Sequence, residues 1–221
     1  MRSTKKQKMK LLEIKEEAKY CKVCFKKIKR NSLYSITNKD IFVCTDCLER
    51  LKPHFRSFKI ANIPGMSIFD YDESIQSFLF QLKGCYDYEL SIIFLERYRK
   101  ELWLMYHDFV LIPAPSAKED DEKRQFNHVL EIFNKLGIQI QQIIYKTEKY
   151  KQSDHSANER RNVSKVLKID ETACIKNKKV LLVDDVFTTG STLKAMVNLV
   201  KPLKPKKIKI LVMSKTRFKE Q

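Results

Sequence analysis

Glycine is scarce in this sequence, which has only Gly65, Gly84, Gly137 and Gly190 among its 221 residues. None of them is followed by lysine, so no phosphate loop of the form G-x-x-x-x-G-K-[ST] occurs, and no G-x-G-x-x-G run occurs either. These two absences exclude P-loop ATPases and dehydrogenases that bind dinucleotides on a Rossmann fold.

Long apolar runs are also missing. A membrane-spanning helix needs about 18 uninterrupted apolar residues, and no stretch of the sequence approaches that length. The basic residues 1–20 contain no apolar run of the kind found in signal peptides. We therefore expect no membrane span and a cytoplasmic location, where paired cysteines indicate a metal site rather than disulfides.

The basic charge is concentrated at the two ends of the chain. Residues 1–60 carry 17 basic and 6 acidic side chains, residues 61–200 carry 19 and 20, and residues 201–221 carry 8 and 1. The net charge is +17, yet 43% of the residues are hydrophobic, which favours a folded core. We expect one near-neutral domain with a small appendage and basic ends that suit contact with phosphate backbones.

Four of the six cysteines form a doubled C-x2-C pattern. Cys21 and Cys24 are followed, after nineteen residues, by Cys44 and Cys47. Two such knuckles complete a closed tetrahedral site for Zn2+, and a site without an open coordination position is structural. The metal would replace a hydrophobic core in a piece of about 35 residues. The alternative is four reduced thiols in an ordinary domain.

The remaining cysteines and most histidines stand alone. We expect Cys85 and Cys174 to be small buried side chains, and His107 to be a packed or surface residue. His128 and His155 have no serine or cysteine nucleophile pattern near them, so no hydrolase triad is predicted.

A second informative segment spans residues 179–193. Residues 180–183 are four apolar β-formers, typical of a buried strand in a parallel sheet. Asp184 and Asp185 follow at the carboxyl end of this strand, where open α/β sheets bind ligands. Residues 193–201 have the apolar spacing of a helix. The loop between them consists of hydroxyl residues around one glycine: Thr188, Thr189, Gly190, Ser191 and Thr192.

This order of strand, loop and helix places backbone N–H groups and hydroxyls at a helix N-terminus, which forms an anion site. The loop suits a single phosphate and is too short to enclose a triphosphate. Because carboxylates repel phosphate, Asp184 and Asp185 must face another part of the ligand. A ribose 5-phosphate satisfies both halves, since its vicinal hydroxyls can donate to the carboxylates. The alternative is a buried strand with an acidic turn and a capped helix.

The segment VLLVDDVFTTGST resembles the phosphoribosyl pyrophosphate (PRPP) signature of type I phosphoribosyltransferases and matches it at every position. Together with the cysteines, it resembles the ComF (ComFC) competence family over nearly the whole chain. Gln125 and His128 depart from the family's usual Gly and Gln. The resemblance is also carried by Tyr71, Leu82-Lys83, Pro113 to Ser116, Arg124 to His128, and Gln152 to Asn162.

The resemblance implies an α/β type I phosphoribosyltransferase fold, a mostly parallel sheet flanked by helices, preceded by a small zinc-binding module. We expect a basic N-terminal tail at residues 1–18, the zinc module at 19–57 and the phosphoribosyltransferase-like domain at 58–221. The apolar pattern predicts helices near residues 73–83, 88–106 and 126–136, and strands near 66–71, 109–112, 140–145 and 207–214.

The resemblance also implies roles for single residues. Asp184 and Asp185 would be the catalytic pair that fixes the ribose, and residues 188–192 would bind its phosphate. Residues 151–161 fall where the fold carries a hood over its site. The candidates for the pyrophosphate loop are Ala114, Pro115, Ser116 and Lys118. Four cations would either meet pyrophosphate oxygens or lie on solvated faces: Lys83, Arg124, Arg160 and Arg161.

Two functions follow. We favour a ComF-type protein of natural competence that binds PRPP or a nucleotide phosphate and holds single-stranded DNA on its basic surfaces, beside a helicase-like partner of DNA uptake. The alternative is an active phosphoribosyltransferase that transfers ribose 5-phosphate to an unidentified base or amine, without a DNA role. The implied cofactors are structural Zn2+ and Mg2+ bound with PRPP. The aromatic residues of the zinc module either offer stacking surfaces or form its core: Phe25, Tyr34, Phe42 and Phe55.

Overall fold

A five-stranded sheet forms the centre of the molecule in the computed structural model, which describes residues 19–29, 41–147, 167–170 and 172–216. The strand order is β1-β2-β7-β6-β3. β1 is antiparallel to β2, whereas β2, β7, β6 and β3 are parallel neighbours, which confirms the predicted mostly parallel sheet. The strands are β1 (Arg56–Ile60), β2 (Ile63–Asp70), β3 (Phe109–Pro113), β6 (Lys179–Phe187) and β7 (Lys207–Lys215).

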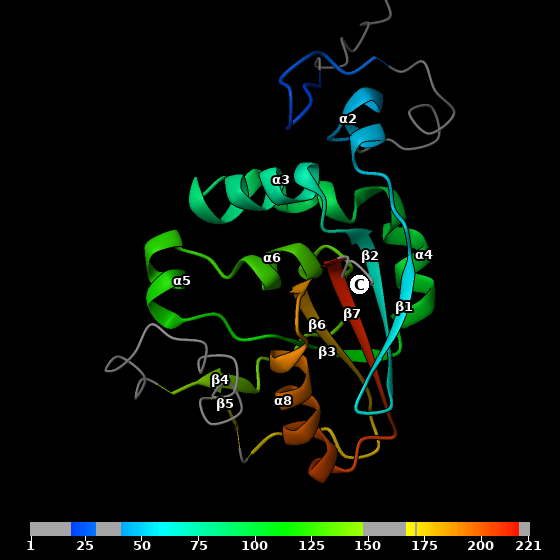
Figure 1. Cartoon of the computed structure of the whole chain (residues 1–221), viewed down its shortest axis with the longest axis vertical. Coiled ribbons are helices and arrows are strands. Elements are labelled where there is room, and N and C mark those ends of the chain that lie inside the picture. The colour runs from blue at the N-terminus through cyan, green and yellow to red at the C-terminus, as the bar shows by residue number, and fades with distance from the viewer. Residues whose placement is uncertain (1–18, 30–40, 148–166, 171, 217–221) are drawn as a thin grey trace, which may run out of the picture.

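Helices cover both faces of this sheet (Figure 1). Because side chains alternate between the faces of a strand, Leu181 and Val183 of β6 pack with the helices of one face, while Leu182 packs with the helix of the other. The first face carries α3 (Glu73–Gly84), α4 (Arg99–Tyr106) and α6 (His128–Asn134), and the second carries α8 (Ser191–Val200). The predicted helices near 73–83 and 126–136 are thus confirmed. No helix within the described ranges is long and apolar enough to cross a membrane.

The predicted long helix over 88–106 is wrong. The chain forms two 3-10 segments, η1 (Tyr88–Phe94) and η2 (Glu96–Tyr98), before α4 begins. Leu90 and Ile93 are both buried, and a spacing of three suits a 3-10 turn as well as an α-helix. The β-branched pair Ile92-Ile93 lowers the preference for α-helix, so the pattern of burial was right and the type of helix was not.

Two further segments differ from expectation. The strand near 140–145 contributes only a bridge between Ile140 and Leu111 to the main sheet. Its last residues form β4 (Ile144–Lys146), which pairs antiparallel with β5 (Leu167–Ile169) in a separate two-stranded sheet. A short helix that the sequence pattern did not predict, α5 (Lys118–Arg124), follows β3.

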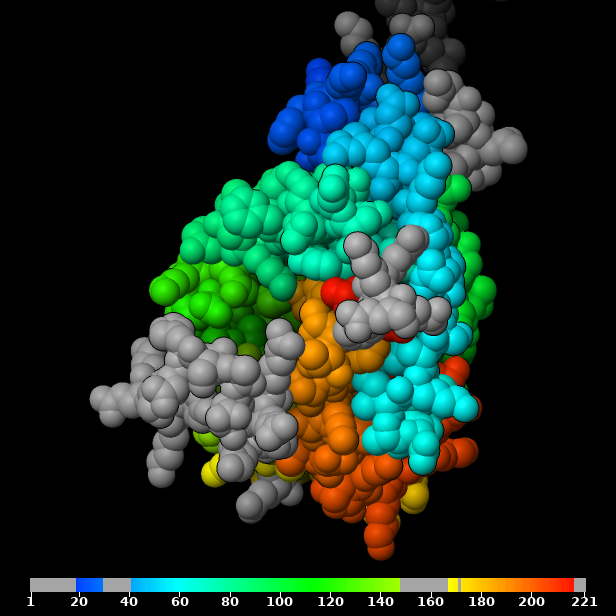
Figure 2. All heavy atoms as spheres, viewed as in Figure 1, coloured from blue at the N-terminus to red at the C-terminus, as the bar shows by residue number. Residues whose placement is uncertain are grey.

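The cysteine-containing segment packs directly on the body, as the blue and cyan residues of Figure 2 show. Its helix α2 (Thr45–Arg50) buries Leu48 in the cluster that contains α3 and η1. The Arg50 guanidinium lies 5.2 Å from the ring centre of Phe78 in α3, and the Phe42 N–H donates to Glu96 Oε1 at 2.9 Å. The predicted boundary at residue 58 stays a prediction; β1 already begins at Arg56.

A glycine in β2 allows two aromatic rings to meet across the sheet. Gly65 lies opposite Phe58 of β1, and a Cβ added at Gly65 would be 2.4 Å from the Phe58 ring. This close approach lets Phe58 stack on Phe187 at the end of β6, with ring centres 4.6 Å apart.

We expect Gly65→Ala to lower the free energy of unfolding by about 1–3 kcal/mol, because the new methyl group displaces the Phe58 ring. Urea denaturation measures the effect. The matched control is Gly84→Ala, whose Cβ meets the ring of Phe80, which is 66% exposed and free to move. Equal destabilisation by both variants would contradict the role of the Phe58 stack.

Candidate functional site

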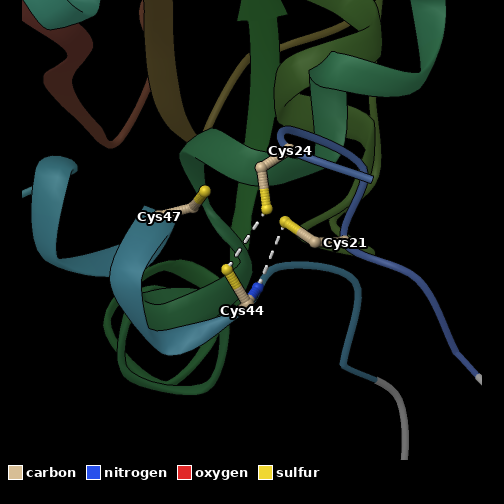
Figure 3. A group of neighbouring side chains, drawn as sticks. All are labelled: Cys21, Cys24, Cys44 and Cys47. Atoms are coloured by element: carbon tan, nitrogen blue, oxygen red, sulfur yellow. Dashed lines mark hydrogen bonds between the residues drawn. The ribbon is translucent and has the colours of Figure 1, made fainter. Parts of the chain in front are cut away.

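Cys21, Cys24, Cys44 and Cys47 come together as predicted, with their four sulfur atoms within 4.8 Å of one another. Figure 3 shows the four thiols pointing toward a common centre. The Sγ atoms of Cys24 and Cys44 are 3.6 Å apart. Zinc–sulfur bonds of about 2.3 Å in a tetrahedron require thiolates about 3.8 Å apart, so the donor set fits Zn2+.

Backbone geometry prepares these thiols for a metal. Cys44 caps α2 and Cys47 lies in that helix. The N–H groups of Val23 and Cys44 point at Cys21 Sγ, at 3.4 and 3.3 Å. Burial opposes ionisation, but the N–H groups outweigh it and lower the pKa of Cys21 to about 7. Burial and the neighbouring thiols raise the pKa of Cys47, so its thiolate needs a bound cation.

Three isolated residues lie outside this cluster. Cys85 and Cys174 are exposed, so the expectation that both are buried is wrong. Cys85 caps the end of α3 and Cys174 lies in the loop after β5, positions that the sequence pattern did not identify as surface. The Nδ1 atom of His54 is 3.4 Å from Asp70 Oδ2.

Asp184 and Asp185 lie within β6, because pairing with β7 continues as far as Phe187 and Lys215. The predicted strand was therefore too short at its carboxyl end. Asp185 is buried, and its Oδ2 is ion-paired with Lys83 of α3 and lies 3.2 Å from His128 Nε2 of α6. Alternation along the strand places Asp184 on the face covered by α8.

His128 links Asp185 to α5. Its Nδ1 lies 2.8 Å from a guanidinium nitrogen of Arg124. Because a guanidinium can only donate, Nδ1 must accept, and Nε2 carries the proton that is donated to Asp185. Arg124 in turn lies 3.7 Å from Asp121.

The same network continues to the loop after β3. Ser116 donates to Asp121 Oδ2, and Asn127 Nδ2 donates to Ser116 Oγ at 2.8 Å. Asn127 also caps α6 by accepting from the Leu130 N–H at 2.9 Å. Contacts thus run from Asp185 on β6 to Ser116 in the candidate pyrophosphate loop.

The two carboxyl groups have opposite pKa shifts. Burial and the negative charge of Asp185 raise the pKa of Asp184 well above its usual range. Burial would also raise the pKa of Asp185, but the hydrogen bond from His128 and the charge of Lys83 outweigh it and hold that pKa well below its usual range. Asp185 therefore carries the charge of the pair.

The hydroxyl loop of residues 188–192 leads directly into α8. Gly190 caps that helix with φ 72° and no side-chain cap. A Cβ at Gly190 would lie 2.3 Å from the Phe187 ring, so both conformation and space require glycine here. The Ser191 N–H donates to Thr189 Oγ1 at a long 3.4 Å. The start of α8, with no cap from Gly190 and with the hydroxyls of Thr189 and Ser191 beside it, is suited to an anion.

The four pyrophosphate-loop candidates, Ala114, Pro115, Ser116 and Lys118, all line one pocket of about 400 Å³. The Ala114 N–H donates to the Val183 carbonyl at 2.8 Å, so this loop stays attached to β6 next to the acidic pair.

The structure explains both departures noted in the sequence. Gln125 ends α5 with φ 64°, a conformation that favours the family's usual glycine, and its side chain donates to the Glu122 carbonyl at 2.8 Å. His128 accepts from Arg124 and donates to Asp185, which a glutamine amide can also do.

Several of these positions could not be assigned from the sequence. Lys83 and Arg124 had two explanations there and His128 had no role, although all three belong to the network around Asp185. No role was predicted for Asp121 or Asn127. Asn127 lies within the segment Arg124 to His128 that carries the resemblance, and Asp121 had no signal beyond closeness in sequence to Arg124. Arg160, Arg161 and the rest of the predicted hood lie outside the described residues.

Comparison with known proteins finds similarity over most of the chain. The model of the phosphoribosyl transferase domain family matches residues 129–219. Competence protein ComFC of Streptococcus pneumoniae is 24% identical over 200 residues, which cover 81% of this chain and 90% of that protein. ComFC of Bacillus subtilis is 26% identical over 190 residues, which cover 83% of this chain and 78% of that protein. The chain is thus similar to ComFC proteins over most of its length and contains a segment that matches the phosphoribosyl transferase domain.

The chain has the type I phosphoribosyltransferase fold, with a cysteine cluster compatible with an N-terminal zinc module. Similar solved structures include a hypoxanthine phosphoribosyltransferase from Staphylococcus aureus, at 13% identity and a TM-score of 0.38, covering 59% of this chain and 75% of that one. They also include adenine phosphoribosyltransferase from Saccharomyces cerevisiae, at 15% identity and a TM-score of 0.38. That match covers 77% of this chain and 88% of the other chain.

We expect the purified chain to contain one Zn2+, measured by elemental analysis. Cys47→Ser should lose the metal and lower the free energy of unfolding by at least about 3 kcal/mol, because the cluster also belongs to the core. Cys85→Ser, which removes an exposed isolated thiol, should keep both the metal and the stability. Zinc bound at full occupancy by the Cys47 variant would contradict the four-thiolate site.

Proposed function

We propose that this chain is a ComF-type competence protein that binds PRPP or a nucleotide 5′-phosphate at the carboxyl end of β6. One observation carries the proposal: the acidic pair, the uncapped start of α8 and the loop after β3 lie around one edge of the sheet, and a single network joins Asp185 to Ser116. Carboxylates beside an anion site suit a ligand with both hydroxyls and phosphate.

The two carboxylates would act differently on the ribose. Asp185 is held by Lys83 and His128, which fixes the end of β6. Asp184 is half-buried, and its Oδ1 accepts the Asp185 N–H at 2.9 Å, so its other oxygen is the one to receive a ribose hydroxyl. Residues 188–192 would take the 5-phosphate, and Ala114, Pro115, Ser116 and Lys118 would face the pyrophosphate.

A divalent cation would have one carboxylate beside the pyrophosphate loop. Asp121 lines the same pocket as Ser116, and its Oδ1 has no hydrogen-bond partner, although it lies 3.7 Å from the Arg124 guanidinium. A carboxylate oxygen is the ligand that Mg2+ prefers. Magnesium bound there with PRPP would neutralise charge on the leaving pyrophosphate.

The two ComFC relatives are named as competence proteins, which supports a role for this chain in natural competence. We extend the proposal to a cytoplasmic location, contact with single-stranded DNA through basic surfaces, and a helicase-like partner. The net charge of +17 supports the DNA contact.

Calorimetric titration with PRPP and Mg2+ tests the phosphoribosyl site. We expect saturable binding by the native chain and at least about 10-fold weaker binding by Asp184→Asn/Asp185→Asn, because Asp184 loses one of its two oxygens and the ion pair of Asp185 with Lys83 is broken. Asp108→Asn, at the amino end of β3, is the control and should bind normally. No binding by the native chain would refute the proposal, and pyrophosphate release with an added base or amine would establish the transferase alternative.

Substitutions at His128 test the network. His128→Ala removes both the acceptor for Arg124 and the donor to Asp185, so we expect about 10-fold weaker PRPP binding. His128→Gln restores both hydrogen bonds and should stay within about 3-fold of the native affinity. If both variants bind PRPP like the native chain, Asp185 does not depend on His128 for its position.

A further inference from the structure

Eight lysines gather at the amino-terminal ends of β6 and β7, the edge of the sheet opposite the acidic pair. Lys179 and Lys207 are register partners at the start of the two strands. The loops before them are tied together, since the Lys206 N–H donates to the Lys178 carbonyl at 2.8 Å. We call this surface the lysine edge, and it comprises Lys176, Lys178, Lys179, Lys201, Lys204, Lys206, Lys207 and Lys209.

The backbone holds these lysines in place. Lys204 adopts φ 52° at the end of the 3-10 segment η3 (Lys201–Leu203), and its carbonyl accepts the Asn177 N–H at 3.1 Å. Pro202 and Pro205 stiffen the segment between them. The positive charges are therefore presented at fixed spacing on two facing turns rather than on a flexible tail.

Little negative charge compensates the lysine edge. Within the described residues, Lys179 is the one member with an ion-pair partner, Asp108. Residues 173–183 and 201–212 contain no acidic side chain. Lys179 and Lys207 are register partners of parallel strands, and Asp108 pairs with Lys179 only. The positive charge that remains suits a bound polyanion.

An aromatic surface adjoins the lysine edge. Lys209 lies 5.3 Å from the ring centre of Tyr106, at the end of α4. In the same helix, Trp103 is 44% exposed and stacks on His107 with ring centres 4.9 Å apart. Beside Trp103 is a pocket of about 470 Å³ that Arg99, Lys100 and Lys135 also line.

We propose that the lysine edge and α4 form one binding surface for single-stranded nucleic acid, with phosphates on the lysines and a base stacked on Trp103. An exposed aromatic ring among fixed cations matches the chemistry of a single strand, whose bases are unpaired and free to stack. An anionic membrane or an acidic protein would need the lysines but not the ring. The proposal rests on the DNA contact of the proposed function and moves it from the zinc module to the sheet.

The surface is independent of the phosphoribosyl site. β6 runs nine residues from Lys179 to Phe187, a span of about 26 Å. Figure 1 shows α3 and α6 near the upper end of β6 and β7 and the chain before these strands at the lower end; Figure 2 shows that lower end as the orange and red spheres at the bottom of the molecule. Substitutions on the lysine edge should therefore leave PRPP binding unchanged.

The sequence supplies its own probe, because Trp103 is the only tryptophan. Titrating the full chain with an oligothymidylate of about 20 nucleotides should quench its tryptophan fluorescence. Raising the salt from about 50 to 200 mM should weaken binding at least 100-fold, as expected for several released counterions. Inorganic polyphosphate, which has no bases, should bind without the quench.

Matched charge reversals locate the surface. The edge variant is Lys204→Glu/Lys206→Glu/Lys207→Glu, and the module variant is Lys26→Glu/Lys27→Glu/Lys29→Glu; all six side chains are exposed. We expect the edge variant to bind a labelled oligothymidylate at least about 30-fold more weakly, and the module variant to stay within about 3-fold of native. An equal loss of oligothymidylate affinity in both variants would show an effect of net charge alone and would overturn the assignment of the lysine edge as the binding surface. Native affinity in the edge variant would overturn it too.

Substitutions on α4 test stacking. Trp103→Ala should weaken oligothymidylate binding about 10-fold, whereas Met105→Ala, which truncates a neighbouring side chain that is 47% exposed, should not. Binding of anionic phospholipid vesicles in preference to the oligonucleotide, or no oligonucleotide binding by the native chain, would refute the proposal. Failure of PRPP binding with the edge result intact would refute the phosphoribosyl site and leave this surface standing.

Discussion

The burial of one ionised carboxylate, Asp185, sets the arrangement of the elements around the site. A charge inside a sheet is tolerated only when donors and an opposite charge surround it. Lys83 comes from the end of α3 and His128 from the start of α6, so both helices must lie over the same end of β6. The Ser214 hydroxyl of β7 adds a hydrogen bond to the Asp185 carbonyl at 3.2 Å. Breaking such a buried pair costs about 3–5 kcal/mol, which makes the position of these helices a condition of stability as well as of ligand binding.

The helix α3 also connects Asp185 to the cysteine cluster. Near its middle, Phe78 lies under the Arg50 guanidinium of α2, and five residues later Lys83 reaches Asp185. Cys21 and Cys47 share the buried cluster of Phe78 and Leu82, so the thiols and the body have one core. A metal bound by these thiols would therefore stabilise the surface on which α3 rests. The cysteine-containing segment thus supports α3 through a shared core.

The sequence alone predicted those features that depend on residue type and spacing within one short segment. The doubled cysteine pairs, the strand before Asp184 and the hydroxyl loop with Gly190 follow from spacing and from backbone requirements that can be seen along the chain. The network was not visible, because His128 and Asp185 are 57 residues apart and meet only when α6 packs on β6. Gln125 and His128 differ from the residues usual at these positions of the motif. In the structure, however, Gln125 adopts the positive φ that a glycine would adopt, and His128 makes two hydrogen bonds. The prediction of an α-helix over the two 3-10 segments before α4 was wrong for a different reason, because their apolar spacing fits both kinds of helix.

The parallel strands place the lysine edge and the acidic pair at opposite edges of the sheet. Parallel β6 and β7 both begin at one edge and end at the other, so their first residues collect Lys179 and Lys207 while the last residues of β6 present Asp184 and Asp185. Lys179 and Asp185 are six residues apart along β6, a separation of about 20 Å. This distance exceeds the Debye length of about 8 Å at physiological salt, so the lysine edge and the acidic pair are electrostatically separate. The topology thus allows a polyanion to be held on the lysine edge without drawing it into the phosphoribosyl site.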